Sequence, residues 1–191
     1  MITTIVIWLL LVLVLGAGAT FAAIAFFRPD RVMAWLAAGS LIVAIVLAWL
    51  GSGGVPPFLS ILIVIGGMVI AVFGGGPAAV MALDLATKGS VREGVHGGIM
   101  VSDGKQTLDG QGGGREILRG GMTIGVLERF AVVAAIVAGF PEALAIIVAV
   151  KGVGRFTELE SSEARERFII GTLASLTWAC LCGGLVRLAI G

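Results

Sequence analysis

The sequence has few of the residues on which catalytic and metal sites usually depend. Its 191 residues include no tyrosine, one histidine and two cysteines. The histidine, His96, has no second histidine and no cysteine near it, which argues against a metal site. A Walker A sequence and a G-x-S-x-G nucleophile elbow are also missing. The sequence therefore predicts no metal, no cofactor and no catalytic residue, and it disfavours an enzymatic function.

The placement of the cysteines and the low charge exclude further classes of protein. Cys180 and Cys182 stand two residues apart in an apolar stretch, so on a helix they point about 200° apart and no disulfide or metal site is expected. Charged residues make up only 13% of the chain, and the formal net charge is +1. Because a strongly basic surface is missing, we expect no binding to nucleic acid.

Long apolar stretches dominate what remains. Hydrophobic residues make up 58% of the chain, and the mean hydropathy is +1.09. Together with 30 glycines, which suit close packing of helices in lipid, these values indicate an integral membrane protein. A helix of about 20 apolar residues is long enough to cross the hydrocarbon core. We predict an all-α, polytopic membrane helix bundle with six transmembrane helices, at residues 2–27, 33–50, 58–73 or beyond, 122–140, 141–156 and 168–190.

A polar loop divides the predicted helices into two groups. Residues 1–83 hold the first three helices, residues 84–120 form a glycine-rich loop, and residues 121–191 hold the last three. The stretch at 141–156 is short, and a re-entrant segment there is the alternative to a sixth span. Within the loop, residues 99–108 are compatible with a hairpin around a Ser-Asp-Gly-Lys turn.

Three glycines and a proline at residues 74–77 interrupt the third apolar stretch. Glycine weakens a helix, and proline suits the first position of a new one. We therefore expect the third helix to kink or break near its cytoplasmic end. In the alternative, the helix ends at the membrane interface and a separate interfacial helix follows.

The lysines and arginines of the predicted loops indicate the orientation in the membrane. The connections at residues 51–57 and 139–142 contain neither residue type, whereas the loops that alternate with them are rich in both. Under the positive-inside rule, six spans place both termini outside and the glycine-rich loop in the cytoplasm. We expect a multi-pass protein of the bacterial plasma (inner) membrane. The loop cations are Arg28, Arg31, Lys88, Arg92, Lys105, Arg115, Arg119, Lys151, Arg155, Arg165 and Arg167.

Glu128 and Arg129 stand side by side inside the fourth predicted span. Gly125 and Glu128 share a stripe of mostly small residues, so Glu128 is expected to face the helix bundle. An ionisable residue at mid-span costs about 2.5 to 3.5 kcal/mol on insertion scales, which disfavours an unpaired Glu128. Arg129 lies about 100° further round the helix, and we expect it to bend toward the same partner or to snorkel.

The neighbouring helix offers two cations to Glu128. The short turn Gly-Phe-Pro-Glu at residues 139–142 predicts an antiparallel hairpin. Counting back from this turn puts Glu128 at nearly the depth of Lys151, and Arg155 lies one turn further on. We expect Glu128 to form an ion pair with Lys151 or Arg155. Gly125, Gly171 and Ser175 are expected to pack against neighbouring helices.

Residues 119–179 carry three short motifs that resemble a known family. The motifs are G-x-x-E-R, A-x-K-x-x-x-R-F and I-G-T-L-x-S. They resemble an uncharacterised bacterial family of small multi-spanning membrane proteins, and the resemblance implies no known activity. In this sequence they comprise Gly125, Glu128, Arg129, Ala149, Lys151, Arg155, Phe156, Ile170, Gly171, Thr172, Leu173 and Ser175.

Two classes of function follow from these features. Glu128, Arg129, Lys151 and Arg155 form a polar cluster that lines a small-solute or ion pathway, as in a transporter, or binds a lipid head group. Alternatively the cluster is structural, and the chain is an accessory or assembly subunit of a membrane protein complex or a homo-oligomer. Small-residue faces at residues 16–23 and 171–184 would then contact the partner. In both cases the lipid bilayer is the immediate partner.

The orientation is directly testable. In a variant without its native cysteines, Lys105→Cys should not react with a membrane-impermeant thiol reagent in intact cells, because the loop is expected in the cytoplasm. The same cysteine should react once the membrane is permeabilised. Labelling in intact cells would contradict the predicted topology.

Overall fold

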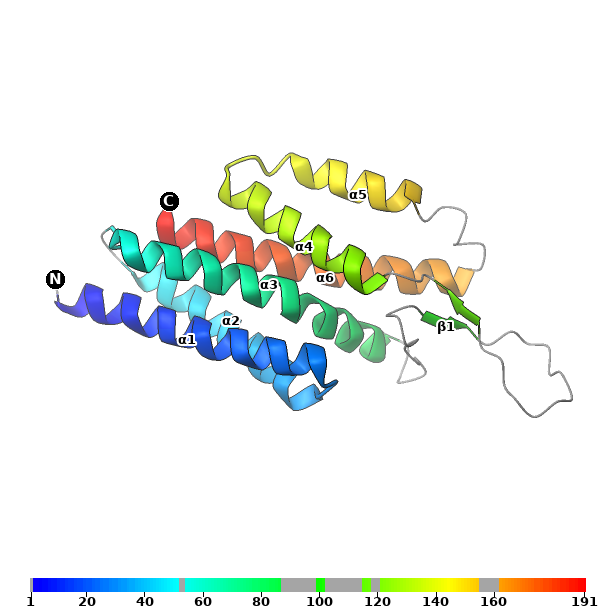
Figure 1. Cartoon of the computed structure of the whole chain (residues 1–191), viewed down its shortest axis with the longest axis horizontal. Coiled ribbons are helices and arrows are strands. Elements are labelled where there is room, and N and C mark those ends of the chain that lie inside the picture. The colour runs from blue at the N-terminus through cyan, green and yellow to red at the C-terminus, as the bar shows by residue number, and fades with distance from the viewer. Residues whose placement is uncertain (1, 52–53, 87–98, 102–114, 118–120, 155–161) are drawn as a thin grey trace, which may run out of the picture.

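The computed structural model describes residues 2–51, 54–86, 99–101, 115–117, 121–154 and 162–191. These parts of the chain form a helical bundle and one small two-stranded ribbon (Figure 1). The helices are α1 (Ile2–Phe27), α2 (Arg31–Leu50), α3 (Pro57–Ala86), α4 (Gly121–Val137), α5 (Ala143–Gly154) and α6 (Ser162–Ile190). The strands are β1 (Ile99–Val101) and β2 (Arg115–Ile117).

Polar and special residues set the ends of the helices. The side chain of Asp30 accepts a hydrogen bond of 2.8 Å from the backbone N–H of Val32 and so caps α2. Pro57 occupies the first position of α3, where its missing N–H has no helical partner to lose. Gly139 ends the fourth helix with a φ of 77°, a conformation that residues with a Cβ rarely adopt.

Four helices of the described chain, α1, α2, α3 and α6, are long and apolar enough to cross a membrane. The sequence predicted six spans, and the described parts of α4 and α5 do not confirm the fourth and fifth. They contain 17 and 12 residues, or about 26 and 18 Å at 1.5 Å per residue, against about 30 Å of hydrocarbon. The predicted turn at residues 139–142 takes Gly139 and Pro141 out of this apolar stretch.

The core lies where α3 packs against α1 and α6. Leu11 and Leu15 of α1, Ile63 and Ile70 of α3, and Val186 of α6 have almost no exposed surface. The hairpin of α4 and α5 packs on this core mainly through α4, and α5 lies on its outer side with Leu144 and Ile147 half-buried against the core (Figure 1). All of α5 is described, and none of its residues is buried. The fifth helix is therefore peripheral.

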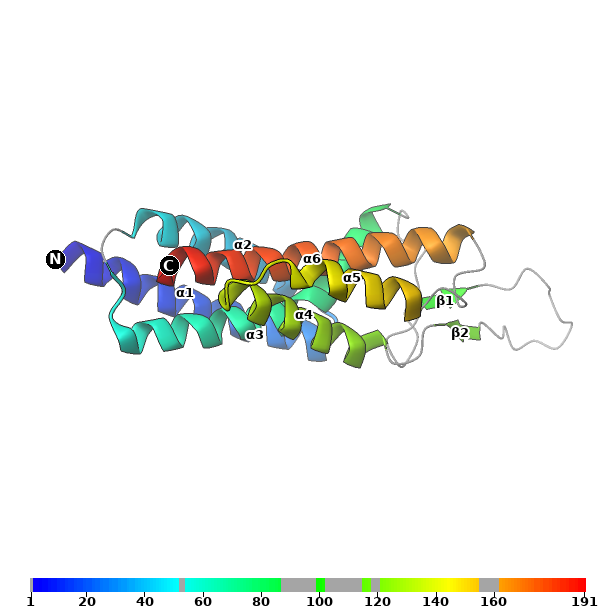
Figure 2. The same cartoon turned by 90° about the horizontal axis from the view of Figure 1, so that it is seen from above.

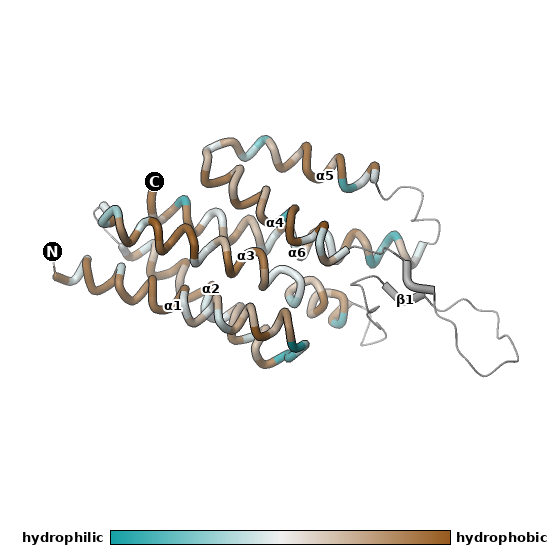
Figure 3. Tube along the Cα trace, viewed as in Figure 1, coloured by the Kyte–Doolittle hydropathy of each residue, from teal (hydrophilic) through white to brown (hydrophobic). Residues whose placement is uncertain are grey.

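The two termini lie at the same end of the bundle (Figures 1 and 2). At the opposite end, the guanidinium of Arg31 forms an ion pair of 2.8 Å with the carboxylate of Asp84, which ties the start of α2 to the end of α3. Figure 3 shows hydrophilic residues gathered at this end, where α1 meets α2 and where α6 begins. Because the α4–α5 hairpin returns to the end from which it starts, it does not change the side on which the chain terminates.

The third helix continues through the three glycines and Pro77 to Ala86, so of the expected kink or break, the break is wrong. Figure 2 shows that its last turns bend away from the direction of its first part. Proline removes one backbone hydrogen bond and pushes against the preceding turn, which accounts for a bend of this kind. No separate interfacial helix begins at Pro77 in this described stretch.

The ribbon in the polar loop differs from the expected hairpin. Ile99 pairs with Ile117 and Val101 with Arg115, in antiparallel register. The partner strand is therefore residues 115–117, and not the segment directly after the Ser-Asp-Gly-Lys turn. Residues 102–114, which include that turn, lie outside the described residues.

The turn after α4 gives a prediction about stability. Gly139→Ala should lower the free energy of unfolding by about 1 kcal/mol, because alanine is strained at positive φ. Gly39→Ala in α2 is the control, since an added Cβ there meets no described atom within 4 Å. Unfolding in detergent, followed by circular dichroism, should separate the two variants. Equal stability of both would contradict the role of Gly139.

Candidate functional site

Arg129 lies inside the bundle between α3, α4 and α6. Its relative exposure is 4%. Its Nε donates a hydrogen bond of 2.8 Å to the backbone carbonyl of Val72 in α3. Its Nη1 donates a hydrogen bond of 3.1 Å to the Oγ of Ser175 in α6. Both partners lie near the middle of their helices, so the charge of Arg129 sits deep in the apolar part of the structure.

Glycines supply the volume that this side chain needs. A Cβ added to Gly75 would collide with the Cδ of Arg129 and lie 3.0 Å from its Nε. A Cβ added to Gly125 would lie 2.9 Å from Nη1 of the same side chain. The glycine run of α3 therefore makes room for an arginine that reaches across from α4.

Trp178 packs on the adjacent glycine of the same run, Gly74. Its Nε1 donates a hydrogen bond of 2.9 Å to the backbone carbonyl of Ile70. A Cβ added to Gly74 would lie 2.7 Å from Cε2 of the indole. Side chains from α4 and α6 thus bind neighbouring carbonyls of α3, and the glycines allow both to approach.

Glu128 faces the other way and forms an ion pair with Lys151 of α5. The side chains are 11% and 16% exposed. The Nζ of Lys151 also lies 5.9 Å from the ring centroid of Phe168 in α6, within the range of a cation–π contact. Counting from the turn identified Lys151 correctly as a partner. The second candidate, Arg155, lies outside the described residues.

The directions of the adjacent charges differ from the expectation. We predicted that Glu128 faces the bundle and that Arg129 bends to the same partner or snorkels, but Arg129 occupies the interior and Glu128 points to α5. The physical reason is the space left by Gly75 and Gly125, together with a carbonyl and a hydroxyl that accept its hydrogen bonds. The periodicity of a single helix carries no information about glycines on its neighbour.

The expected packing residues have unequal roles. Gly125 is buried beside the guanidinium, and Ser175 is buried as a hydrogen-bond acceptor. Gly171 is less tightly packed, because an added Cβ would lie at an ordinary 3.5 Å from Leu83. Sequence reasoning missed Trp178 and Phe168. A tryptophan in the last apolar stretch, opposite three glycines in the third, was the available signal.

The described cluster carries more positive than negative charge. Among the described residues of this cluster, Arg129 and Lys151 are positive, and the one carboxylate, that of Glu128, pairs with Lys151. Of the five N–H donors of a guanidinium, two have partners among the described residues here. This excess of one positive charge lies in a region that is largely closed to water.

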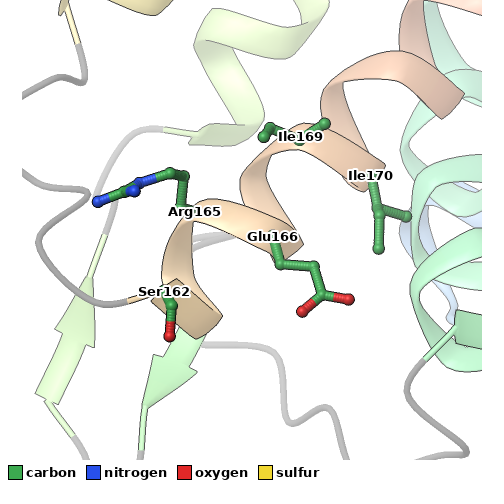
Figure 4. Close-up of a pocket in the computed structure, with 5 residues that line it drawn as sticks. All are labelled: Ser162, Arg165, Glu166, Ile169 and Ile170. Atoms are coloured by element: carbon green, nitrogen blue, oxygen red, sulfur yellow. The ribbon is translucent and has the colours of Figure 1, made fainter.

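An open depression lies on the first turns of α6, near the polar end of the bundle. Ser162, Arg165, Glu166, Ile169 and Ile170 line it (Figure 4). Figure 4 shows Arg165 and Glu166 pointing in different directions. The depression is therefore a mixed polar and apolar surface at the start of α6.

Comparison with protein-family models, with curated proteins and with solved structures finds no match for this chain. The resemblance of residues 119–179 to a bacterial membrane protein family therefore stays a prediction.

The glycine run allows a prediction with a matched control, because an added methyl group would meet Arg129 at Gly75 but not at Gly76. Gly75→Ala should destabilise the protein by about 1 to 3 kcal/mol, because the new methyl group occupies the path of Arg129. Gly76→Ala is the matched control, since its Cβ would lie 3.7 Å from the ring of Phe26. Thermal unfolding in detergent measures both. A Gly76→Ala variant as unstable as Gly75→Ala would show that helix geometry, and not Arg129, sets the requirement.

The ion pair gives a second prediction. Glu128→Lys should destabilise the protein, because it sets like charges together in a poorly hydrated place. Adding Lys151→Glu should restore part of the loss if the two side chains interact directly. A double-mutant cycle on unfolding free energies measures the coupling. Strictly additive effects would count against a direct interaction.

Proposed function

We propose that the chain is an integral protein of the bacterial plasma membrane that binds an anionic group at its polar cluster. Of the described helices, α1, α2, α3 and α6 cross the bilayer, and α4 and α5 enter it and return as a hairpin. Their lengths support this arrangement. Both termini face outside and the glycine-rich loop faces the cytoplasm, as the positive-inside rule favours.

The charge of the cluster carries the proposal of anion binding. Arg129, Lys151 and Glu128 together carry a net charge of +1, because the carboxylate of Glu128 pairs with Lys151 and Arg129 has no carboxylate partner among the described residues. An unbalanced charge in apolar surroundings is expensive. An anion bound near Lys151 would balance this charge. A site with more cations than carboxylates is suited to phosphate or carboxylate ligands.

The packing around Arg129 favours binding over conduction. Val132, Val133 and Ile70 are fully buried, and Trp178 is hydrogen-bonded across the α3–α6 contact. Large apolar side chains therefore fill the bundle on both sides of the guanidinium. A solute pathway would need polar groups in continuous succession, whereas this cluster lies at one side of a packed core.

The alternative, an accessory subunit that uses small-residue faces, has less support. Gly18 of α1 packs against Ser40 of α2, and Gly183 of α6 packs against Ile136 of α4. Both small-residue faces therefore serve contacts within this chain. Gly16 and Gly184 remain with no described atom within 4 Å of an added Cβ.

Ligand-dependent stability tests the proposal. Inorganic phosphate should raise the Tm of the purified protein relative to chloride at equal ionic strength, because a ligand of the native state stabilises it. Glu128→Gln should strengthen the effect by removing the competing carboxylate. Glu128→Gln combined with Lys151→Gln should abolish it. Arg187→Gln, an exposed cation at the far end of α6, is the control and should keep the response.

The purely structural reading gives a different result. If the cluster only holds the hairpin, Glu128→Gln loosens it and phosphate has no specific effect in any variant. Equal phosphate responses in the parent and in the double variant would also contradict an anion site at Lys151.

A further inference from the structure

The first part of α3 is held by side chains from three other helices. The backbone carbonyl of Ile70 accepts a hydrogen bond from Trp178 of α6. The carbonyl of Val72 accepts one from Arg129 of α4. The ring of Phe73 lies edge-on to an aromatic ring of α1, with 5.3 Å between the centroids. The backbone just before the glycine run is therefore fixed in place.

The last part of α3, Pro77–Ala86, is attached at few points. All of it is described, and Leu83 is its one buried residue. Ala78, next to the proline, is half-buried against the core. An added Cβ on Gly171 of α6 would lie 3.5 Å from Leu83, so there is room for a methyl group between the two helices here. This segment therefore packs on the bundle more loosely than the first part.

An ion pair ties the far end of this segment to α2. The carboxylate of Asp84 lies 2.8 Å from the guanidinium of Arg31. The side chain of Arg31 is 78% exposed and that of Asp84 is 20% exposed. Ion pairs in contact with water contribute little and are screened by salt. The end of α3 is therefore held by a contact that breaks at low cost.

The glycine–proline run at residues 74–77 joins the two parts. Pro77 has no backbone N–H, so the carbonyl of Phe73, four residues earlier, lacks its helical hydrogen-bond donor. The glycines before the proline add backbone freedom at the same place. Figure 2 shows the bend of α3 that separates its two parts. The helix is thus least rigid where a fixed part meets a loosely held one.

We propose that Pro77–Ala86 is a hinged arm that swings at this run and that the ion pair to α2 holds closed. Ser175, which accepts a hydrogen bond from Arg129, lies one helical turn beyond Gly171 in α6. Opening of the arm therefore uncovers the α3–α6 contact beside the buried guanidinium and admits water from the polar end of the bundle. The arm needs no ligand, so it does not depend on the proposed anion binding.

A cysteine in place of Gly171 reports on the arm, because Leu83 lies against this position when the arm is closed. In a variant without the native cysteines, Gly171→Cys is treated with N-ethylmaleimide in detergent, and the labelling rate measures local opening. Asp84→Asn should raise the rate about two- to five-fold, the range that an exposed ion pair contributes. Pro77→Ala should lower it, because alanine returns an N–H to the helix.

Salt and a charge exchange identify the ion pair as the contact that closes the arm. Added salt should raise the labelling rate of Gly171→Cys and should have no further effect once Asp84→Asn is present, because screening acts on the pair. Arg31→Asp combined with Asp84→Arg should restore slow labelling. Arg28→Gln is the matched control, since it removes another exposed cation between α1 and α2, and it should leave the rate unchanged.

A variant that retains only Cys182 controls for loosening of the whole bundle. This residue is buried where α6 packs against the first part of α3. Its labelling should stay slow when Asp84→Asn is added. If Asp84→Asn accelerates Cys182 as much as Gly171→Cys, the bundle loosens as a whole and the inference is wrong. It is equally wrong if neither Asp84→Asn nor Pro77→Ala changes the labelling of Gly171→Cys.

Discussion

The burial of Arg129 is the constraint on which the central packing depends. A guanidinium in apolar surroundings needs both hydrogen-bond acceptors and volume, because an unsatisfied buried charge is costly. Val72 and Ser175 supply the acceptors, and Gly75 and Gly125 supply the volume. One side chain thereby links α4 to both α3 and α6. This explains why a helix as long as α3 carries consecutive glycines at its centre despite their cost to helix stability.

The second charge of the pair gives the hairpin its position. Since Arg129 takes the interior, the adjacent Glu128 is turned toward α5 and meets Lys151. The fifth helix has no fully buried residue, so this ion pair and the Phe168 contact add to the limited apolar packing of Leu144 and Ile147 on the core. The same arrangement leaves Lys151 at the edge of the bundle. The ion pair that attaches α5 to α4 therefore also leaves Lys151 partly exposed at the edge of the bundle.

The sequence was sufficient for features that depend on local pattern. Apolar stretches predicted the positions of the helices, and counting from the turn at residues 139–142 predicted the Glu128–Lys151 pair. Other features depend on neighbours far along the chain. The inward direction of Arg129 follows from Gly75, which lies 54 residues earlier in the chain. Hydropathy records that residues are apolar, but it does not record where the backbone stops being helical.

Because α4 and α5 form a hairpin, the distribution of lysines and arginines is compatible with four spans as well as with six. An element that enters and returns adds an even number of passages, so the termini share a side whether α4 and α5 cross fully or turn within the bilayer. The positive-inside rule is therefore satisfied equally by both arrangements. What distinguishes them is the depth of Lys151. In the orientation that we propose, a short hairpin that begins and ends at the cytoplasmic face would hold the end of α5 near the head groups, so the cation would remain charged at a modest cost and still pair with Glu128.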